Sequence, residues 1–449
     1  MTSGQCVTVV GGGLAGSEAA WQLAEVGYDV ELFEMRPTVQ TPAHQTGELA
    51  EIVCTNSFKS EALNTAHGLL KAEMRQLGCM LLQVADATRV EAGSALAVDR
   101  RLFAAEVTRR IKAHPRISVR SSEITQLPAG AAIIATGPLT SDALSEAVRS
   151  RLGEAGLAFF DAIAPIFSRE SIDEEVAWLA SRYDRGAAAY LNCPFDRAQY
   201  ETFVAELLAA DVYEGHDWDE VPYFEGCLPI EVMAQRGVDT LRFGPLRPVG
   251  LPDPQTGRIH HAVAQLRTED RDGRMWNLVG FQTRLRIGEQ ERVFRLIPGL
   301  QEAEFLRHGS VHRNSYINFP KCLTEYGSLP DCGDLIFAGQ LTGVEGYTES
   351  IASGLLAAGN LDRVLSGQEA AIPPGSTMLG GLYRYLREAD PTHFQPMNAN
   401  FGLVDSLPNR VKGKSARREA LATRALEALE AWQRQTWGDP SHTPSPAAA

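Results

Sequence analysis

The sequence predicts an α/β protein in which a Rossmann-like domain is interrupted by an inserted α+β domain. Near the N-terminus, residues 7–16 form a β-prone run that enters a glycine-rich turn and a helical pattern, and a second strand pattern follows at 29–34. Prolines and aromatic residues then punctuate short segments between about 155 and 275, and regular elements return from Trp276. A regular pattern that is interrupted and later resumed is typical of one domain inserted into another.

The glycine-rich turn has the GxGxxG spacing of a dinucleotide-binding loop. Gly11 permits the tight turn, Gly13 lets backbone amides approach a pyrophosphate, and Gly16 lets the helix pack close to the strand. The pyrophosphate would meet the positive end of the helix dipole. Glu34 follows Gly16 by eighteen residues, close to the roughly 20 expected for the acid that holds a ribose hydroxyl. We therefore predict dinucleotide binding by Glu34 and by the loop residues Gly11, Gly12, Gly13, Leu14, Ala15 and Gly16. The alternative is an ordinary strand–turn–helix with Glu34 merely exposed.

The composition is that of an ordinary globular protein. Hydrophobic residues make up 44% and charged residues 22% of the 449, both common values. No apolar run reaches the roughly 18 residues of a membrane helix, and no basic region with an apolar core precedes the first strand. We expect a cytoplasmic protein without membrane contact. The seven cysteines are scattered, with no CxxC and no Cys/His cluster at metal spacing, so neither a disulfide framework nor a metal site is expected.

A long loop is expected after the first βαβ pieces. Residues 37–60 contain prolines but little periodicity, and Cys54 lies within them. Such an irregular segment in a compact domain is usually functional. The regular elements expected next are helices at 66–77 and 99–111 and strands at 117–120 and 131–137. The last of these strands ends in Ala-Thr-Gly, where Gly137 would let the chain pass close to a dinucleotide.

A second glycine-rich turn lies in the C-terminal part of the chain. The strand expected at 334–340 leads into a turn at 341–347 and a helix of small residues at 348–360. Such a turn can bring backbone amides to the pyrimidine edge of a flavin, whose negative charge on reduction the helix N-terminus can stabilise. Because the chain has no second GxGxxG, we expect one permanently bound dinucleotide, FAD rather than NAD. The further residues predicted to bind it are Gly137, Gly339, Gln340, Gly346 and Tyr347. A simply packed amphipathic helix is the alternative.

The pattern divides the chain into expected domains. Residues 1–154 and 276–436 form the FAD-binding domain, residues 155–275 form an inserted domain for the substrate, and residues 437–449 form a disordered tail. A polar helix is expected at about 416–432.

The charge distribution bears on partners. The net charge of −14 argues against broad binding of nucleic acid. The span 236–320 differs, with thirteen Arg and no Lys against nine acidic residues, a net charge of +4. A salt-bridged, solvated surface is the ordinary explanation of such a span.

Five motifs occur together in this order: Gly11-Gly-Gly-Leu-Ala-Gly16, Glu48-Leu-Ala-Glu-Ile-Val-Cys-Thr-Asn-Ser57, Phe224-Glu-Gly-Cys-Leu-Pro-Ile-Glu231, Thr240-Leu-Arg-Phe-Gly-Pro-Leu-Arg-Pro-Val-Gly250 and Gly339-Gln-Leu-Thr-Gly-Val-Glu-Gly-Tyr347. Together they resemble the folate- and FAD-dependent tRNA (uracil-5-)-methyltransferases, the TrmFO family. The resemblance extends from the first strand to about Gly413. The FAD motifs are shared with the related GidA-type wobble-uridine flavoproteins, so the two cysteine motifs discriminate. The fold implied is the Rossmann-like FAD-binding fold of the glutathione-reductase and GidA type.

The resemblance implies methylation of C5 of uridine 54 in the tRNA T-loop. The carbon would come from 5,10-methylenetetrahydrofolate and the reducing equivalents from NADPH or NADH through FAD. Uracil C5 is not nucleophilic until a group adds at C6, and a thiolate is the usual addend. By match to the family motifs, Cys227 would be this nucleophile, and Cys54 the second catalytic thiol, near the flavin, as the base or to protect the flavin. The folate, the nicotinamide and the oligomeric state leave no local motif.

An unstacked uridine in an RNA loop would require a basic surface with aromatic residues. In the Arg-rich span, the residues that could supply it are Arg242, Arg247, Arg284, Arg286, His260, His261, Phe243, Trp276 and Phe281.

An isolated cysteine is most often a small buried hydrophobe, and we expect this of Cys6, Cys79, Cys193, Cys322 and Cys332. Two other functions stay open: a GidA-type flavoprotein that modifies wobble uridine with a partner GTPase, and a flavin-bearing RNA-binding or chaperone protein without turnover.

Overall fold

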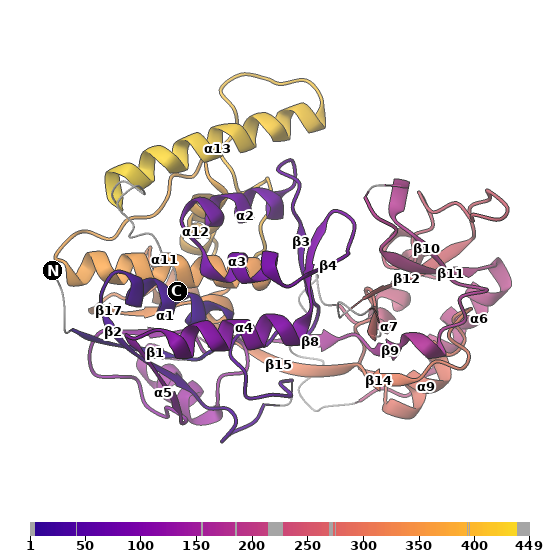
Figure 1. Ribbon diagram of the computed structural model, residues 1–449, viewed down its shortest axis with the longest axis horizontal. Coiled ribbons are helices and arrows are strands. Elements are labelled where there is room, and N and C mark those ends of the chain that lie inside the picture. Colours follow the sequence, from indigo (N-terminus) through magenta and orange to yellow (C-terminus); the bar gives the residue numbers. More distant parts are fainter. Residues whose placement is uncertain are drawn as a thin grey trace.

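A mostly parallel sheet forms the core of the first of two lobes (Figure 1). The computed structural model describes residues 5–437 apart from 42, 154–155, 185, 214–227, 269–272, 274, 393 and 395. The strand order of the sheet is β16-β17-β7-β1-β2-β6, and only the β16–β17 pair is antiparallel. The strands are β1 (Cys6–Val10), β2 (Asp29–Glu34), β6 (Ile117–Ser121), β7 (Ala132–Ile134), β16 (Ser328–Leu329) and β17 (Cys332–Phe337).

Helices cover both faces of this sheet because neighbouring strand residues point to opposite sides. Val9 and Ile133 pack with α1 (Leu14–Glu25), α4 (Arg100–Ala113) and α11 (Tyr347–Leu365). Their neighbours Val10 and Ile134 pack with α5 (Asp142–Leu152) on the other side. Apolar residues that are buried on both faces of a sheet are typical of α/β proteins.

The first and last thirds of the chain meet where α1 packs on α11. A Cβ at Gly354 of α11 would lie 2.1 Å from the carbonyl oxygen of Ala15 in α1. A Cβ at Gly16 would lie 1.8 Å from the carbonyl oxygen of Gly11. These two glycines therefore allow the close packing between the helices and against the turn, as predicted for Gly16.

Two buried carboxylates from neighbouring helices cap helix starts in this lobe. Glu18 accepts hydrogen bonds from the backbone N–H groups that begin α3 (Met80–Ala87), and Glu73 of α2 (Ala66–Gln76) does so for α12 (Met378–Glu388). Burial raises the pKa of Glu73 to about 7. The backbone N–H groups in the first turn of a helix have no hydrogen-bond acceptor within the helix, and these carboxylates serve as their acceptors.

The second lobe (residues 164–309) is built on an antiparallel sheet of order β10-β11-β12-β13-β9-β14. Its strands are β9 (Ile166–Ser168), β10 (Trp178–Ala180), β11 (Tyr190–Phe195), β12 (Ala262–Thr268), β13 (Met275–Leu278) and β14 (Phe305–Arg307). Its helices are α6 (Arg197–Ala209), α7 (Ile230–Gln235), α8 (Thr240–Phe243) and α9 (Ile287–Phe294), with short 3-10 turns η1 (Arg169–Ser171) and η2 (Arg182–Asp184). An apolar core that includes Phe203, Phe281 and Phe294 holds them together.

The expected domain boundary at 275 is corrected by this sheet. Residue 275 begins β13, which pairs with β9 and β12, and β14 closes the edge of the same sheet at 305–307. Residues 276–307 therefore belong to the second lobe. The regular elements that follow Trp276 are α9, which packs in the core of the second lobe, and β14, which joins its antiparallel sheet.

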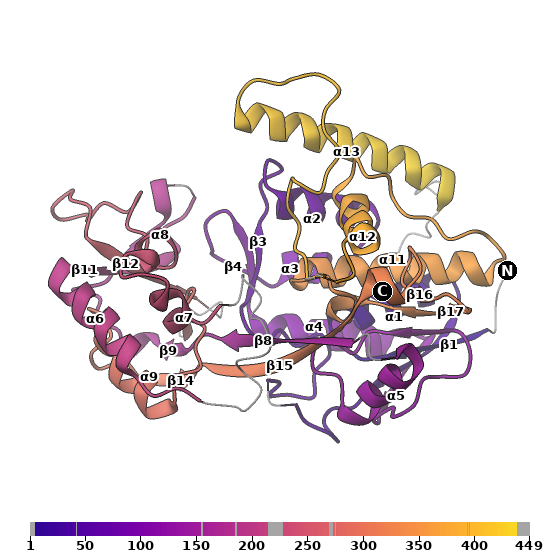
Figure 2. The ribbon, with the colours of Figure 1, turned by 180° about the vertical axis from the view of Figure 1, so that it is seen from behind.

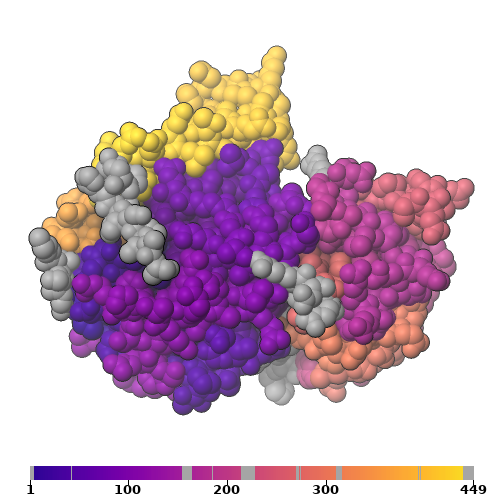
Figure 3. Space-filling model, viewed as in Figure 1, coloured from indigo at the N-terminus to yellow at the C-terminus, as the bar shows by residue number. Residues whose placement is uncertain are grey.

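A two-stranded antiparallel ribbon connects the lobes. Strand β8 (Gly156–Ile163) leaves the first lobe and β15 (Ser310–Ile317) returns to it, paired along their whole length. Figure 2 shows both strands running between the lobes, and Figure 3 shows the second lobe beside the larger body.

A small sheet beside the first lobe carries the end of the predicted 37–60 loop. It has the order β3-β5-β4, with β3 (Ser57–Ser60), β4 (Arg89–Val90) and β5 (Ala95–Val98). Residues 57–60 are thus a strand and not a loop as expected, because they pair with β5. The remaining elements are α10 (Phe319–Cys322), η4 (Gly339–Thr342) and α13 (Lys414–Thr436). No helix among the described residues is long and apolar enough to cross a membrane.

Trp437, the first residue of the predicted tail, packs against the first lobe and is not part of a disordered tail as expected. Trp437 follows α13 and packs its ring on Trp432, with 5.0 Å between ring centroids, and against Gly359 of α11. The rest of the predicted tail, 438–449, lies outside the described residues.

Candidate active site

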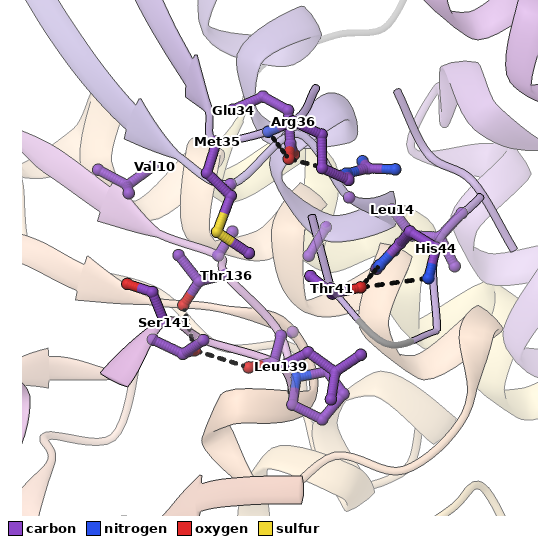
Figure 4. A pocket seen from close by; sticks show the side chains of 18 of the residues that line it. Val10, Leu14, Glu34, Met35, Arg36, Thr41, His44, Thr136, Leu139 and Ser141 are labelled. Carbon is purple, nitrogen blue, oxygen red and sulfur yellow. Dashed lines mark hydrogen bonds and ion pairs between the residues drawn. The ribbon is translucent and has the colours of Figure 1, made fainter. Parts of the chain in front are cut away.

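A cleft of about 1010 Å³, including space open to solvent, lies where β1, β2 and β7 end and α1 begins (Figure 4). Ligands of open α/β sheets bind at the carboxyl ends of the strands. The predicted cofactor residues that line it are Gly11, Gly13, Leu14, Ala15, Glu34, Gly137, Gly339, Gln340 and Tyr347. Both glycine-rich turns, which are more than 300 residues apart in the sequence, therefore meet at one cleft.

The first turn has the geometry of a pyrophosphate site. Gly13 is the N-cap residue of helix α1, which has no side-chain cap and no acidic residue in its first turn. A Cβ at Gly13 would have no atom within 4 Å, whereas a Cβ at Gly11 would lie 2.5 Å from the carbonyl oxygen of Ala135. The space at Gly13, with uncapped N–H groups at the positive end of a helix dipole, fits a phosphate group. The residues of this turn thus fit the diphosphate of a dinucleotide.

Glu34 is buried, with 6% of its surface exposed, at the end of β2. Its Oε2 accepts a 2.8 Å hydrogen bond from the Gly12 N–H, and its Oε1 accepts bonds from the backbone and the guanidinium of Arg36. Burial opposes ionisation of Glu34, but these bonds and the charge of Arg36 outweigh it and lower the pKa. The alternative of an exposed Glu34 is therefore wrong. The hydrogen bond to a ribose hydroxyl remains a prediction.

Three of the predicted cofactor residues do not line the cleft. Gly12, Gly16 and Gly346 are absent from its lining. Gly12 binds Glu34, Gly16 packs α1 on the turn, and Gly346 (φ +115°) begins α11. A role of these three glycines in cofactor binding stays a prediction.

Sequence reasoning missed a polar cluster at the cleft. It consists of Arg36, Thr41, His44 and Glu51, from the segment that follows β2. The hydroxyl of Thr41 lies 2.6 Å from His44 Nδ1. Burial and the charge of Arg36 lower the pKa of His44 to about 4, so its imidazole is neutral at pH 7. The sequence offered one signal for the cluster, the arginine two residues after Glu34.

Cys54 lies beside the cleft and contacts Tyr347. The Tyr347 hydroxyl lies 3.2 Å from the sulfur of Cys54 and donates a hydrogen bond to it. Tyr347 and Val53 line the cleft, so both neighbours of this thiol reach the cofactor pocket. A predicted catalytic residue and a predicted cofactor residue are thus in direct contact.

Arginines hold the segment around Cys54. Arg307 of β14 donates a 2.8 Å hydrogen bond to the Val53 carbonyl, to which Arg100 of α4 also donates. Arg267 of β12 donates to the side chains of Thr55 and Asn56. Because Arg267 and Arg307 belong to the second lobe, the Cys54 segment is part of the contact between the lobes.

The other cysteines differ from Cys54. Cys227 lies outside the described residues. Cys79 and Cys193 are fully buried, and burial raises the pKa of Cys193 to about 12. Cys322 is also buried as expected. The expectation is wrong for Cys332, which is half-buried beside Asp334, and for Cys6, which is exposed. No group of three or more His, Cys, Asp or Glu side chains in the described structure could hold a metal ion.

The sequence matches known proteins along most of its length. The family model described as glucose inhibited division protein A matches residues 6–369. A methylenetetrahydrofolate–tRNA-(uracil-5-)-methyltransferase TrmFO from Desulforudis audaxviator is 54% identical over 95% of this chain and 98% of its own. The proteins of the same name from Heliobacterium modesticaldum and Enterococcus faecalis are 53% and 51% identical, each over 94% of this chain and 97% of theirs.

The chain belongs to the TrmFO family. Solved structures agree with this assignment at the level of the fold. Two crystal forms of Aquifex aeolicus GidA superpose with TM-scores of 0.70 and 0.67, at 15% and 16% identity. They cover 97% and 96% of this chain, which in turn covers 74% and 77% of theirs. The predicted Rossmann-like fold of the GidA type is therefore confirmed, and the TrmFO relatives decide between the two families that the FAD motifs left open.

Proposed function

We propose that this TrmFO-family chain is an FAD-dependent enzyme that methylates C5 of a tRNA uridine, with 5,10-methylenetetrahydrofolate as carbon donor and NADPH or NADH as reductant. The observation that carries the proposal is the thiol of Cys54 in contact with Tyr347, which lines the dinucleotide cleft. The proposed reaction both activates uracil and reduces a one-carbon unit, and it therefore requires a thiol beside the cofactor.

The residues of the cleft fit FAD. The N–H groups at the start of α1, beside Gly13, would hold the diphosphate, and Glu34 the ribose. The second glycine-rich turn, with Gly339 and Gln340, would meet the flavin. Bound FAD would supply the hydride-transfer chemistry that the protein's side chains lack.

The two thiols have different roles in the proposed reaction. We assign to Cys227 the addition to C6, which makes C5 nucleophilic, and to Cys54 the removal of the C5 proton or the protection of the flavin. Cys54 is suited to a role near the flavin because the first lobe holds it at the cofactor cleft. Cys227, by its place in the sequence, would be brought by the second lobe.

The RNA would contact the second lobe, which we propose as the substrate domain. Of the aromatic residues expected to stack on bases, Trp276 and Phe281 are buried in the core of this lobe, so that expectation is wrong for both. Phe243 is 83% exposed at the end of α8, and Arg247 and Arg286 are exposed as well. These three remain candidates for stacking and phosphate contact. Because the substrate is tRNA, we place the enzyme in the cytoplasm.

We further propose uridine 54 of the T-loop as the methylated position. Unmodified tRNA transcripts with uridine or cytidine at position 54 are incubated with the holoenzyme, methylenetetrahydrofolate and NADPH, and ribonuclease fragments are analysed by mass spectrometry. We expect one added methyl group in the T-loop fragment of the first transcript and none in the second. Methylation elsewhere would contradict the T-loop assignment. A product that appears only with a second protein and an amine donor would instead indicate GidA-type chemistry, and tight RNA binding without any product a binding protein.

A further inference from the structure

The hydroxyl oxygen of Tyr347 lies where three consecutive backbone amides converge. It accepts hydrogen bonds from the N–H groups of Val53 at 3.1 Å, Cys54 at 2.8 Å and Thr55 at 3.2 Å. Consecutive amides that point to one spot form a concave site that favours negative charge. Here the site is filled by a phenolic oxygen from α11, which therefore fixes the backbone on both sides of Cys54.

The same hydroxyl donates a hydrogen bond to the sulfur of Cys54 at 3.2 Å. Hydrogen bonds accepted by an oxygen polarise its O–H bond and strengthen the bond that it donates. Burial raises the pKa of Tyr347 well above its usual range, and the proximity of Cys54 adds to this. The phenol therefore keeps its proton at neutral pH and remains a donor.

We propose that Tyr347 is a positioning residue for the Cys54 thiolate, which it holds beside the cofactor cleft and stabilises through a hydroxyl polarised by the amides of residues 53–55. A donor to the charged form of a group favours that form. Tyr347 thereby combines two tasks, since it lines the cleft and its hydroxyl donates a hydrogen bond to the sulfur of Cys54. The proposal rests on the proposed function only for the reaction that the thiolate serves.

Other charged groups also face the segment around Cys54. Arg100 donates from α4 to the Ile52 and Val53 carbonyls, Arg307 from β14 to Val53, and Arg267 from β12 to Thr55. Their positive charges favour a thiolate as well. A change confined to the Tyr347 hydroxyl leaves all three guanidinium groups in place, so the contribution of the hydroxyl is separable from theirs.

The test is the pH dependence of Cys54 alkylation in the holoenzyme of Tyr347→Phe. Iodoacetamide labelling is followed by mass spectrometry of the Cys54 peptide, with Cys332 as internal reference. We expect the midpoint to move up by about one pH unit, which makes labelling about 10-fold slower at pH 7. Tyr383→Phe is the matched control, because this other buried tyrosine meets Ser353 and its loss should leave the midpoint unchanged. An unchanged midpoint in Tyr347→Phe, with flavin still bound, would overturn the proposal.

A second variant covers the case in which Tyr347→Phe fails to hold flavin. Replacement of Tyr347 by 3,5-difluorotyrosine keeps the ring and the hydroxyl but makes the hydroxyl a stronger donor. We expect the Cys54 midpoint to move down, and a midpoint that stays or rises would overturn the proposal. Because labelling needs neither tRNA nor folate, this result is independent of whether the proposed methylation is correct.

Discussion

Replacement of Cys54 by alanine is expected to lower tRNA methylation by about 100-fold or more, a contribution typical of a positioned acid–base group. Cys54 is held by Tyr347 at the cofactor cleft, so its loss removes the thiol without removing any residue that lines the cleft. Bound FAD should therefore stay at the parent level. The measurement is 5-methyluridine formed per enzyme at saturating substrates, with the flavin absorbance recorded on the same samples.

Cys332→Ala is the control for this prediction, since this thiol is half-buried in β17 and hydrogen-bonds to Asp334. It should retain parent activity. Transcripts with 5-fluorouridine separate the two thiols, because fluorine at C5 cannot be removed as a proton and an adduct at C6 persists. Cys54→Ala should still form the adduct and Cys227→Ala should not. Parent-level turnover in Cys54→Ala would refute the role given to this residue.

The second large effect is expected from Gly16→Ala. A Cβ there would lie 1.8 Å from the carbonyl oxygen of Gly11, and neither the turn nor α1 can move away without breaking the packing of α1 on α11. We expect the free energy of unfolding to fall by at least about 2 kcal/mol and flavin to be lost on purification. Thermal unfolding and flavin content measure the two effects.

Gly13→Ala is the matched variant, since a Cβ at Gly13 has no atom within 4 Å in the protein. Its φ of −73° suits alanine. We expect its apo form to be as stable as the parent apo form, yet to bind FAD much more weakly because the methyl group fills the space for the diphosphate. A Gly13→Ala protein with full flavin content would contradict the assignment of the diphosphate to this turn.

The sequence predicted those parts of the fold that local patterns specify. The spacing of glycines 11, 13 and 16 predicts a tight turn before a helix. In the structure, a Cβ at Gly11 or Gly16 would meet nearby backbone atoms, and the space beside Gly13 is open. The return from the inserted domain was placed too early, at Trp276. Strand pairing between β13 and β9 joins residues about 110 apart, and no local pattern reveals such a pairing.

The site was predicted as a set of residues but not as an arrangement. Cys54 and Tyr347 lie 293 residues apart, and their contact depends on the packing of α11 beside the loop. Arg267 lies in the Arg-rich span 236–320, but it is 6% exposed and donates a hydrogen bond to Asn56. The sequence alone does not show whether an arginine contacts phosphate or forms buried hydrogen bonds within the protein, because both roles use the same guanidinium donors.

The most direct test of the central claim follows the carbon atom. The purified protein is incubated with an unmodified tRNA transcript, NADPH and methylenetetrahydrofolate that carries ¹³C at the bridging carbon, and the nucleosides are analysed by mass spectrometry. We predict 5-methyluridine that carries the label, formed by this chain without a second protein. No 5-methyluridine, or 5-methyluridine without the label, would contradict the proposed function.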